Sequence, residues 1–211
     1  MSSKKKLLER SRLYIIVDKK VSGSKSILNI VRKIKDLNPG IIQLRDKESK
    51  KEVILKEAYA LRKLLLKGKT IFIVNDYIDI AKVVESDGIH LGQSDLPLTI
   101  ARKLLGKDKI IGVSCHNLNQ AIQAQKQGAD YISIGPIFPT PIKPEHRDVG
   151  LKLIQMVSKM IHIPFFVIGG INQRNLSKVL SSGAKRVAIC RGICEVKDVT
   201  FTLKKISQIL H

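Results

Sequence analysis

The chain has 211 residues, 44% of them hydrophobic, which is enough to bury the core of one domain. Lysine and arginine number 38 against 18 aspartate and glutamate residues, a formal net charge of +20, but only 4% of residues are aromatic, too few for base-stacking platforms. The three cysteines follow no paired metal-ligand spacing. Composition therefore argues against a nucleic-acid partner, a disulfide framework and a zinc site.

No linker rich in proline, glycine or serine divides the chain, so we predict a single domain over residues 1–211 with a basic extension at residues 1–10. The most apolar stretch, residues 161–171, is interrupted by His162, Pro164 and two glycines, and we expect no membrane span. The basic N-terminus flows into Leu7 without the apolar core and cleavage site of a secretory signal. These features predict a cytoplasmic protein.

Eight short runs rich in isoleucine and valine predict strands that are buried on both faces. In chain order they are residues 13–17, 41–44, 70–74, 88–91, 110–113, 131–134, 165–168 and 186–190. Segments with helical spacing lie between them: apolar residues recur at i, i+4, i+7 and i+11 in the set Ile54, Ala58, Leu61 and Leu65 and again in the set Val199, Leu203, Ile206 and Leu210. Polar caps at Ser24 or Ser26, at Asn117 and at Asn172 predict helix starts.

Strands that alternate with helices eight times over about 200 residues predict an α/β fold, the (β/α)8 TIM barrel. An open doubly wound sheet is the alternative, and it would gather ligand groups at one crevice where the strand order reverses. Polar residues instead follow nearly every predicted strand. This favours the closed barrel, and in either fold the site lies at the carboxyl ends of the strands.

The end of the second strand carries two cations and an amide. Gln43, Arg45 and Lys47 alternate along the chain and can therefore face the same side. Arginine offers a planar fork and lysine a compact charge, which together suit the oxygens of a diphosphate. Ser114, after the fifth strand, could donate its hydroxyl to the same anion. The alternative is a solvated strand end with a charge cluster around Asp46.

Two carboxylates follow neighbouring strands. Asp76 comes after the third strand and Asp95 after the fourth, and adjacent strands lie about 5 Å apart. Such a pair repels unless a cation lies between, and Mg²⁺ accepts one or two carboxylates together with water and phosphate oxygens. The pair predicts a metal-bridged diphosphate site. The alternative is that each carboxylate caps the helix that begins near Tyr77 or Pro97.

The later loops predict a second anion site. Residues 135–144 contain four prolines, which stiffen the loop and can hold Thr140 and Lys143 in place. Gly169 and Gly170 let a ligand approach the backbone N–H groups. The turns after the seventh and eighth strands of barrels commonly bind a phosphate.

Taken in order, these motifs resemble the thiamine-phosphate synthase family, within a superfamily that includes thiazole tautomerases. The matching stretches are residues 43–47 (QLRDK), 75–76 (ND), 90–95 (HLGQSD), 112–114 (GVS), 128–131 (GADY), 135–140 (GPIFPT), Lys143 and 168–171 (IGGI). The resemblance implies a TIM-barrel transferase with Mg²⁺ as cofactor. Its substrates would be 4-amino-2-methyl-5-(diphosphooxymethyl)pyrimidine and 4-methyl-5-(2-phosphooxyethyl)thiazole, and its products thiamine phosphate and pyrophosphate.

The resemblance also implies residue roles. The pyrimidine diphosphate would be bound by Gln43, Leu44, Arg45, Asp46, Lys47, Asn75, Ser114 and Lys143, of which Arg45, Lys47 and Lys143 act in catalysis. The thiazole phosphate would be bound by Thr140, Pro141, Ile142, Gly170, Cys190 and Arg191, and the metal by Asp76 and Asp95. The chain departs from the family at Ile142, where a second threonine is usual, and at Arg191, where serine is usual. Arg191 could replace the missing hydroxyl with a direct charge.

Two other functions stay open. A thiazole tautomerase-like enzyme would use His116 for proton transfer and would not need the metal pair. A noncatalytic protein that binds thiamine precursors would explain Ile142 and Arg191. In each case the partners are small phosphorylated molecules, and a homodimer is compatible with the sequence.

Overall fold

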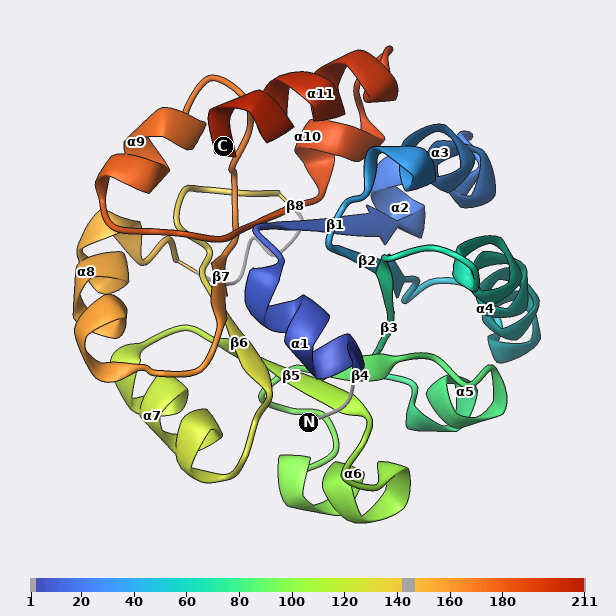
Figure 1. Ribbon diagram of the computed structural model, residues 1–211, viewed down its shortest axis with the longest axis horizontal. Helices are drawn as coiled ribbons and strands as arrows, with labels where there is room; N and C mark the ends of the chain where they lie inside the picture. The colour runs from blue at the N-terminus through green and yellow to red at the C-terminus, as the bar shows by residue number, and fades with distance from the viewer. Residues whose placement is uncertain (1–2, 142–146, 211) are drawn as a thin grey trace.

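In the computed structural model, which describes residues 3–141 and 147–210, eight parallel strands close into a barrel surrounded by helices (Figure 1). The strands are β1 (Leu13–Asp18), β2 (Ile41–Arg45), β3 (Ile71–Asn75), β4 (Gly88–Leu91), β5 (Ile110–Cys115), β6 (Tyr131–Ile134), β7 (Phe165–Val167) and β8 (Val187–Ile189). They pair in chain order, and β8 pairs with β1. The predicted (β/α)8 barrel is confirmed, and the open-sheet alternative is wrong.

The helices follow the predicted apolar pattern. They are α1 (Ser3–Arg10), α2 (Lys19–Ser22), α3 (Ile27–Ile34), α4 (Lys51–Leu65), α5 (Ile78–Val83), α6 (Leu98–Leu105), α7 (Leu118–Lys126), α8 (Gly150–Met160), α9 (Leu176–Ser181), α10 (Arg191–Cys194) and α11 (Val199–Leu210), with a 3-10 turn η1 (Lys35–Leu37). The apolar sets predicted in α4 and α11 are all buried. Ser26 and Asn117 cap α3 and α7 as predicted. The predicted cap of α9 is wrong, because the N-cap is Asn175 and Asn172 accepts a hydrogen bond in the turn before it.

The core has two layers because side chains alternate along each strand. On β2, Ile42 and Leu44 pack outward against the helices, whereas Ile41 points into the barrel. Inside the barrel the rings of Tyr14, Tyr131 and Phe166 meet edge to face, with centroids 5.3 to 5.7 Å apart. Each such aromatic pair contributes about 0.5–1.5 kcal/mol beyond the area it buries.

Helix α1, which contains most of the predicted basic extension, covers the amino ends of the strands (Figure 1). Leu8 is buried against the barrel interior. Lys4 and Lys5 pair with Asp87 and Asp130, which precede β4 and β6. The opposite end of the barrel is therefore the end left for a ligand.

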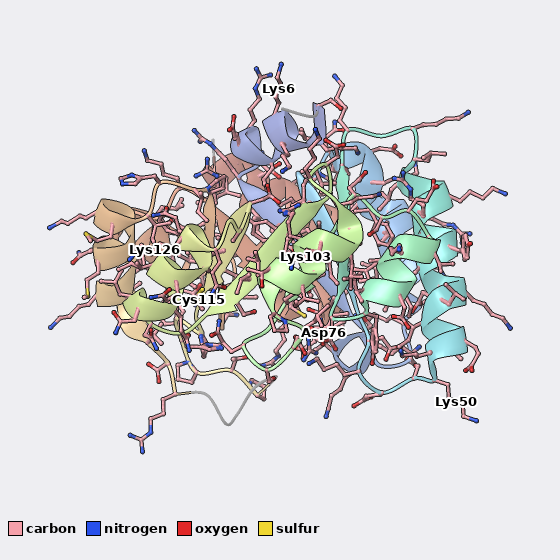
Figure 2. All side chains as sticks on the ribbon, turned by 90° about the horizontal axis from the view of Figure 1, so that it is seen from below. Lys6, Lys50, Asp76, Lys103, Cys115 and Lys126 are labelled. Carbon is pink, nitrogen blue, oxygen red and sulfur yellow. The ribbon has the colours of Figure 1, made fainter. Side chains whose placement is uncertain are left out.

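The basic charge is spread around the outside of the molecule. Figure 2 shows the exposed lysines Lys6, Lys50, Lys103 and Lys126 on different sides rather than on one face. The same view places Asp76 toward the end of the molecule opposite α1. Across residues 3–141 and 147–210, no helix has both the length and the apolar character that crossing a membrane requires.

Candidate active site

Two adjoining cavities open at the carboxyl ends of the strands. The central cavity has a volume of about 400 Å³ and reaches from Gln43 to Arg191. The side cavity has a volume of about 320 Å³ and is lined by residues from the loops after β2, β3, β4 and β5. Arg45, Asn75 and Ser114 line both cavities, as does His116. The two cavities therefore form one mouth.

The polar end of β2 points into this mouth as predicted. Gln43 is 1% exposed, and its amide donates a hydrogen bond to the Tyr14 hydroxyl. Arg45 forms an ion pair with the buried carboxylate of Asp18. The Lys47 ammonium lies 2.8 Å from a carboxylate oxygen of Asp76. A solvated strand end does not describe Gln43 or Arg45, because protein partners hold both side chains at the rim.

The structure does not bring the side chains of Leu44 and Asp46 to the mouth. Leu44 packs in the layer between barrel and helices. The Asp46 carboxylate accepts hydrogen bonds from the backbone N–H groups of Glu48 and Ser49, which orders the loop after β2. Burial alone would raise the pKa of Asp46, but the hydrogen bonds from Ser49 and Glu48 outweigh it and hold the pKa below its usual value. Neither residue lines either cavity.

Asp76 and Asp95 do meet at the rim of the side cavity. The backbone at Asp76 has φ 61°, and the Tyr77 N–H donates to the Asn75 carbonyl at 2.7 Å, so Asp76 occupies a tight, strained turn directly after β3. The side chain of Asp95 accepts a hydrogen bond from the Gly92 N–H at 2.6 Å. Neither carboxylate caps α5 or α6, so the capping alternative is wrong for both.

The two carboxyl groups of Asp76 and Asp95 interact electrostatically. Burial and a hydrogen bond with Asp95 raise the pKa of Asp76, while the hydrogen bond from Lys47 opposes them. In the part of the chain that the structure describes, no group of three or more His, Cys, Asp or Glu side chains could hold a metal. Two carboxylates with water and ligand oxygens in the remaining positions are the set that Mg²⁺ adopts on phosphates, so the residues present fit that ion.

A hydrogen-bonded chain of polar side chains crosses the barrel interior beneath the mouth. The Tyr14 hydroxyl lies 2.8 Å from the Tyr131 hydroxyl, which lies 3.0 Å from His90 Nδ1. His90 Nε2 lies 2.9 Å from Ser114 Oγ and 3.4 Å from Ser133 Oγ. The sequence did not decide whether Tyr14 and His90 take part in the site, and it gave no role to Tyr131 and Ser133. The signal that could have found them is a polar or aromatic residue at an inward position of a strand.

The other half of the mouth is built from turns. Thr140, Gly170, Cys190 and Arg191, which the resemblance assigns to the thiazole phosphate, line the central cavity. Gly169 and Gly170 have positive φ angles of 103° and 65°, and a side chain at Gly170 would come within 2.8 Å of Phe138 Cβ. The amide of Asn175 donates to the Gly170 carbonyl at 2.9 Å, which fixes this turn. Pro141 is exposed and lines neither cavity. Ile142 and Lys143, which the sequence places in the site, lie outside the described residues.

Short helix α10 and its two capping residues place Cys190, Arg191 and Glu195 at the central cavity. Arg191 Nε lies 2.8 Å from Glu195 Oε1, and both side chains are about half exposed. A hydrogen bond with Cys194, together with burial, raises the pKa of Cys190 well above its usual value. The same hydrogen bond lowers the pKa of Cys194 to about 7. Cys190 therefore faces the cavity as a neutral thiol.

Comparisons with known proteins agree with this geometry. The family model described as thiamine monophosphate synthase matches residues 13–193. The chain is 44% identical over 201 residues to the thiamine-phosphate synthase of Halalkalibacterium halodurans, covering 95% of each chain. It is 43% identical over 189 residues to that of Shouchella clausii, covering 89% of this chain and 90% of the relative.

Solved structures show the same architecture. The thiamine phosphate pyrophosphorylase from Pyrococcus furiosus superposes with a TM-score of 0.87 at 30% identity, covering 97% of each chain. A 3-hexulose-6-phosphate synthase superposes with a TM-score of 0.68 at 16% identity, which shows a shared barrel fold alone. The chain therefore belongs to the thiamine monophosphate synthase family of transferases.

Proposed function

We propose that this protein is a thiamine-phosphate synthase. It would join 4-amino-2-methyl-5-(diphosphooxymethyl)pyrimidine to 4-methyl-5-(2-phosphooxyethyl)thiazole and release thiamine phosphate and pyrophosphate. The observation that carries the proposal is the convergence of Arg45 and Lys47 with the contacting carboxyls of Asp76 and Asp95 on one mouth. Family membership supports it independently.

The side cavity suits the diphosphate. Arg45 and Lys47 supply positive charge there, and the Ser114 hydroxyl and the Asn75 amide line the same space. Asp76 and Asp95 would hold Mg²⁺, which neutralises charge on the diphosphate when it is bound. Lys143 joins this group in the proposal on the strength of the family motif.

The chemistry requires stabilisation of a leaving anion. When the C–O bond to the diphosphate breaks, the aminopyrimidine ring shares the positive charge. Arg45 and Lys47 lie where negative charge builds up on the departing group, and preorganised charges of this kind lower the barrier most effectively. The thiazole nitrogen is already a neutral nucleophile, so the bond-forming step needs no general base.

The thiazole phosphate would occupy the turns after β6, β7 and β8. Thr140, Gly170 and Arg191 line the central cavity on that side, next to Cys190. Phosphate sites at the last two strands are a recurring property of this fold. A molecule bound there would present its ring toward the pyrimidine side of the same mouth.

The proposal is tested by incubating the purified protein with both precursors and Mg²⁺ and assaying thiamine phosphate and pyrophosphate by liquid chromatography and mass spectrometry. We expect both products in equal amounts, and none when either precursor is left out or Mg²⁺ is chelated. Binding of both precursors by calorimetry without product would instead identify a noncatalytic binding protein.

One observation favours a second candidate, a thiazole tautomerase. His116 lines both cavities, and its Nδ1 lies 2.6 Å from the Gly135 carbonyl, so Nδ1 carries the proton and Nε2 is the basic nitrogen. Substitution of His116 by alanine should leave synthase activity largely intact, whereas Asp95→Ala should lower it. If turnover of a thiazole phosphate substrate were instead lost in His116→Ala and unaffected in Asp95→Ala, the tautomerase would be favoured.

A further inference from the structure

Five side chains form an unbroken hydrogen-bonded chain whose two ends reach the central cavity. In order, the chain runs through Gln43, Tyr14, Tyr131, His90 and Ser114. Gln43 and Tyr14 are each 1% exposed, Tyr131 is fully buried and His90 is 6% exposed. Gln43 and Ser114 line the central cavity at either end. The interior members have no role in the chemistry proposed above.

Counting protons restricts this chain to two arrangements. A hydroxyl has one proton to donate, and a neutral imidazole has one N–H and one acceptor nitrogen. Burial raises the pKa of both Tyr14 and Tyr131, so both hydroxyls keep their protons. Each of the four contacts is a hydrogen bond and holds one proton, because two protons or two bare acceptors facing each other in a buried contact would be costly. Every donor in the chain must therefore point the same way.

In the first arrangement the Gln43 amide donates to Tyr14, Tyr14 donates to Tyr131, and Tyr131 donates to His90 Nδ1. His90 Nε2 then carries the proton and donates to Ser114, so the Ser114 proton points into the cavity. Gln43 keeps its carbonyl oxygen for the ligand. The structure has this orientation of the Gln43 amide.

The second arrangement reverses every donor. Ser114 donates to His90 Nε2, and Gln43 turns its carbonyl toward Tyr14 and its N–H toward the ligand. The hydroxyl of Ser133, 3.4 Å from His90 Nε2, can rotate to suit either arrangement. The two ends of the cavity thus change their hydrogen-bonding character together.

We propose that this chain makes the site selective for an amino group on the pyrimidine, with Tyr14, Tyr131 and His90 as positioning residues. The inference rests on the proposed function. A diphosphate oxygen only accepts hydrogen bonds, so its contact with Ser114 selects the first arrangement. Gln43 then offers an acceptor and pairs with an N–H donor on the ring. If a carbonyl replaces the amino group of the pyrimidine, its oxygen faces the side-chain carbonyl oxygen of Gln43. Both atoms are acceptors, so no hydrogen bond forms.

The test compares binding of the aminopyrimidine diphosphate with binding of its 4-oxo analogue by calorimetry, with Mg²⁺ and without the thiazole. A binding measurement is used because the two compounds also differ in how readily they lose diphosphate, and this difference in reactivity does not affect Kd. For the unaltered protein we expect Kd to favour the amino compound by about tenfold or more, the effect of one mismatched hydrogen bond. Equal affinities would overturn the inference, and failure to bind either compound would overturn the proposed function as well.

The variant Tyr131→Phe interrupts the hydrogen-bonded chain, so that Gln43 and Ser114 no longer change their donor and acceptor roles together. Tyr14 then loses its acceptor and can donate to a rotated Gln43, so we expect the preference for the amino compound to fall to about twofold or less. Tyr59→Phe is the matched control, because the Tyr59 hydroxyl lies on the exposed face of α4 and donates a hydrogen bond to the Val83 carbonyl, away from the cavity. An unchanged preference in Tyr131→Phe would overturn the inference.

A spectroscopic readout works without any variant. The first arrangement requires that His90 carry its proton on Nε2 when the aminopyrimidine diphosphate is bound. Nitrogen NMR of the histidine ring distinguishes the two tautomers directly. A proton on Nδ1 in that complex would contradict the inference.

Discussion

The two halves of the mouth are built in different ways. After β2 to β5 the site consists of charged side chains held by ion pairs, such as Arg45 with Asp18 and Lys47 with Asp76. After β7 and β8 it consists of a glycine turn and the first residues of α10, where Gly170 and Arg191 meet the cavity. The first half depends on which side chains are present, and the second depends on the path of the backbone.

From this difference we predict where substitutions should be tolerated. The Asp18 carboxylate is 1% exposed, and removing its cation would leave a buried charge without compensation. Arg191, by contrast, is about half exposed and pairs with Glu195, the residue that caps the end of α10. We therefore expect side-chain identity to matter less around Arg191, where the chain departs from the pattern that the resemblance implies.

The largest effect should follow from Arg45→Ala. Loss of a preorganised cation at a developing anion lowers turnover by about 10²–10³-fold. The variant should also unfold at a lower temperature, because Asp18 is left buried and unpaired. Steady-state kinetics and thermal unfolding measure the two effects.

Two controls sharpen this prediction. In the double variant Arg45→Ala with Asp18→Asn, stability should return while activity stays low, which separates catalysis from folding. Arg32→Ala, on the exposed surface of α3, should change neither. Full activity in Arg45→Ala would show that the charged half does not act through its side chains.

Asp95→Asn should raise the Mg²⁺ concentration needed for half-maximal activity by at least about tenfold, because one of two carboxylate ligands is lost. Asp79→Asn is a suitable control, since Asp79 is an exposed carboxylate that pairs with Lys51 away from the mouth. Magnesium titrations of activity distinguish the variants. An unchanged Mg²⁺ requirement in Asp95→Asn would remove Asp95 from the metal site.

Asp76→Asn should weaken Mg²⁺ binding and yet raise the melting temperature at neutral pH. The pKa of Asp76 is raised in the folded protein by burial and by Asp95, so the folded state binds this proton more tightly than the unfolded chain. The resulting stabilisation is present at low pH and is lost as the pH rises through the folded-state pKa. Thermal unfolding curves of the unaltered protein and of Asp76→Asn at acidic and neutral pH test this prediction. The higher melting temperature of the variant should disappear at acidic pH.

The barrel and most of its rim could be predicted because one rule connects them. Parallel strands must place their carboxyl ends at one edge, so polar residues after Leu44, Asn75 and Leu91 had to meet once the strands were found. The sequence pattern ends the first strand at Val17, whereas β1 continues to Asp18, and the partner of Arg45 was missed for that reason.

The interior of the barrel could not be predicted in the same way. Tyr14, His90 and Tyr131 sit within apolar runs, and their contacts depend on strands that are far apart in the sequence. Only closure of the barrel brings β1, β4 and β6 across from one another. The resemblance also assigned Asp46 to the ligand, because a motif does not state which face each of its residues occupies.

Gly170→Ala tests whether the second half depends on the backbone. At φ 65° an added Cβ would crowd Phe138 and Pro139, so we expect the Michaelis constant for the thiazole phosphate to rise by about tenfold or less. Gly23→Ala is the matched control, because Gly23 has φ 57° with no atom within 4 Å of the added carbon. Both variants should lose about 1–2 kcal/mol of stability from the positive φ. Only Gly170→Ala should raise the Michaelis constant for the thiazole phosphate. Equal Michaelis constants in the two variants would contradict a phosphate site that is formed by the backbone.

The smallest effect should come from Arg191. Its guanidinium is shared between Glu195 and the cavity, so Arg191→Ala should raise the Michaelis constant for the thiazole phosphate by only about threefold to tenfold, less than a fully committed charged hydrogen bond provides. The constant for the pyrimidine diphosphate should not change. Equal shifts in both constants would show that Arg191 acts on the fold of the rim rather than on the phosphate.

The variant Glu195→Gln tests whether Arg191 lowers the Michaelis constant for the thiazole phosphate when its ion pair is removed. Removing this carboxylate releases Arg191 from its 2.8 Å ion pair and leaves it next to the cavity, so the Michaelis constant for the thiazole phosphate should fall. In the background of Arg191→Ala the same substitution should have little effect, because no guanidinium remains to be released. A similar change in both backgrounds would mean that Glu195 repels the phosphate directly, and that Arg191 has taken no part in replacing the hydroxyl that the family usually places there.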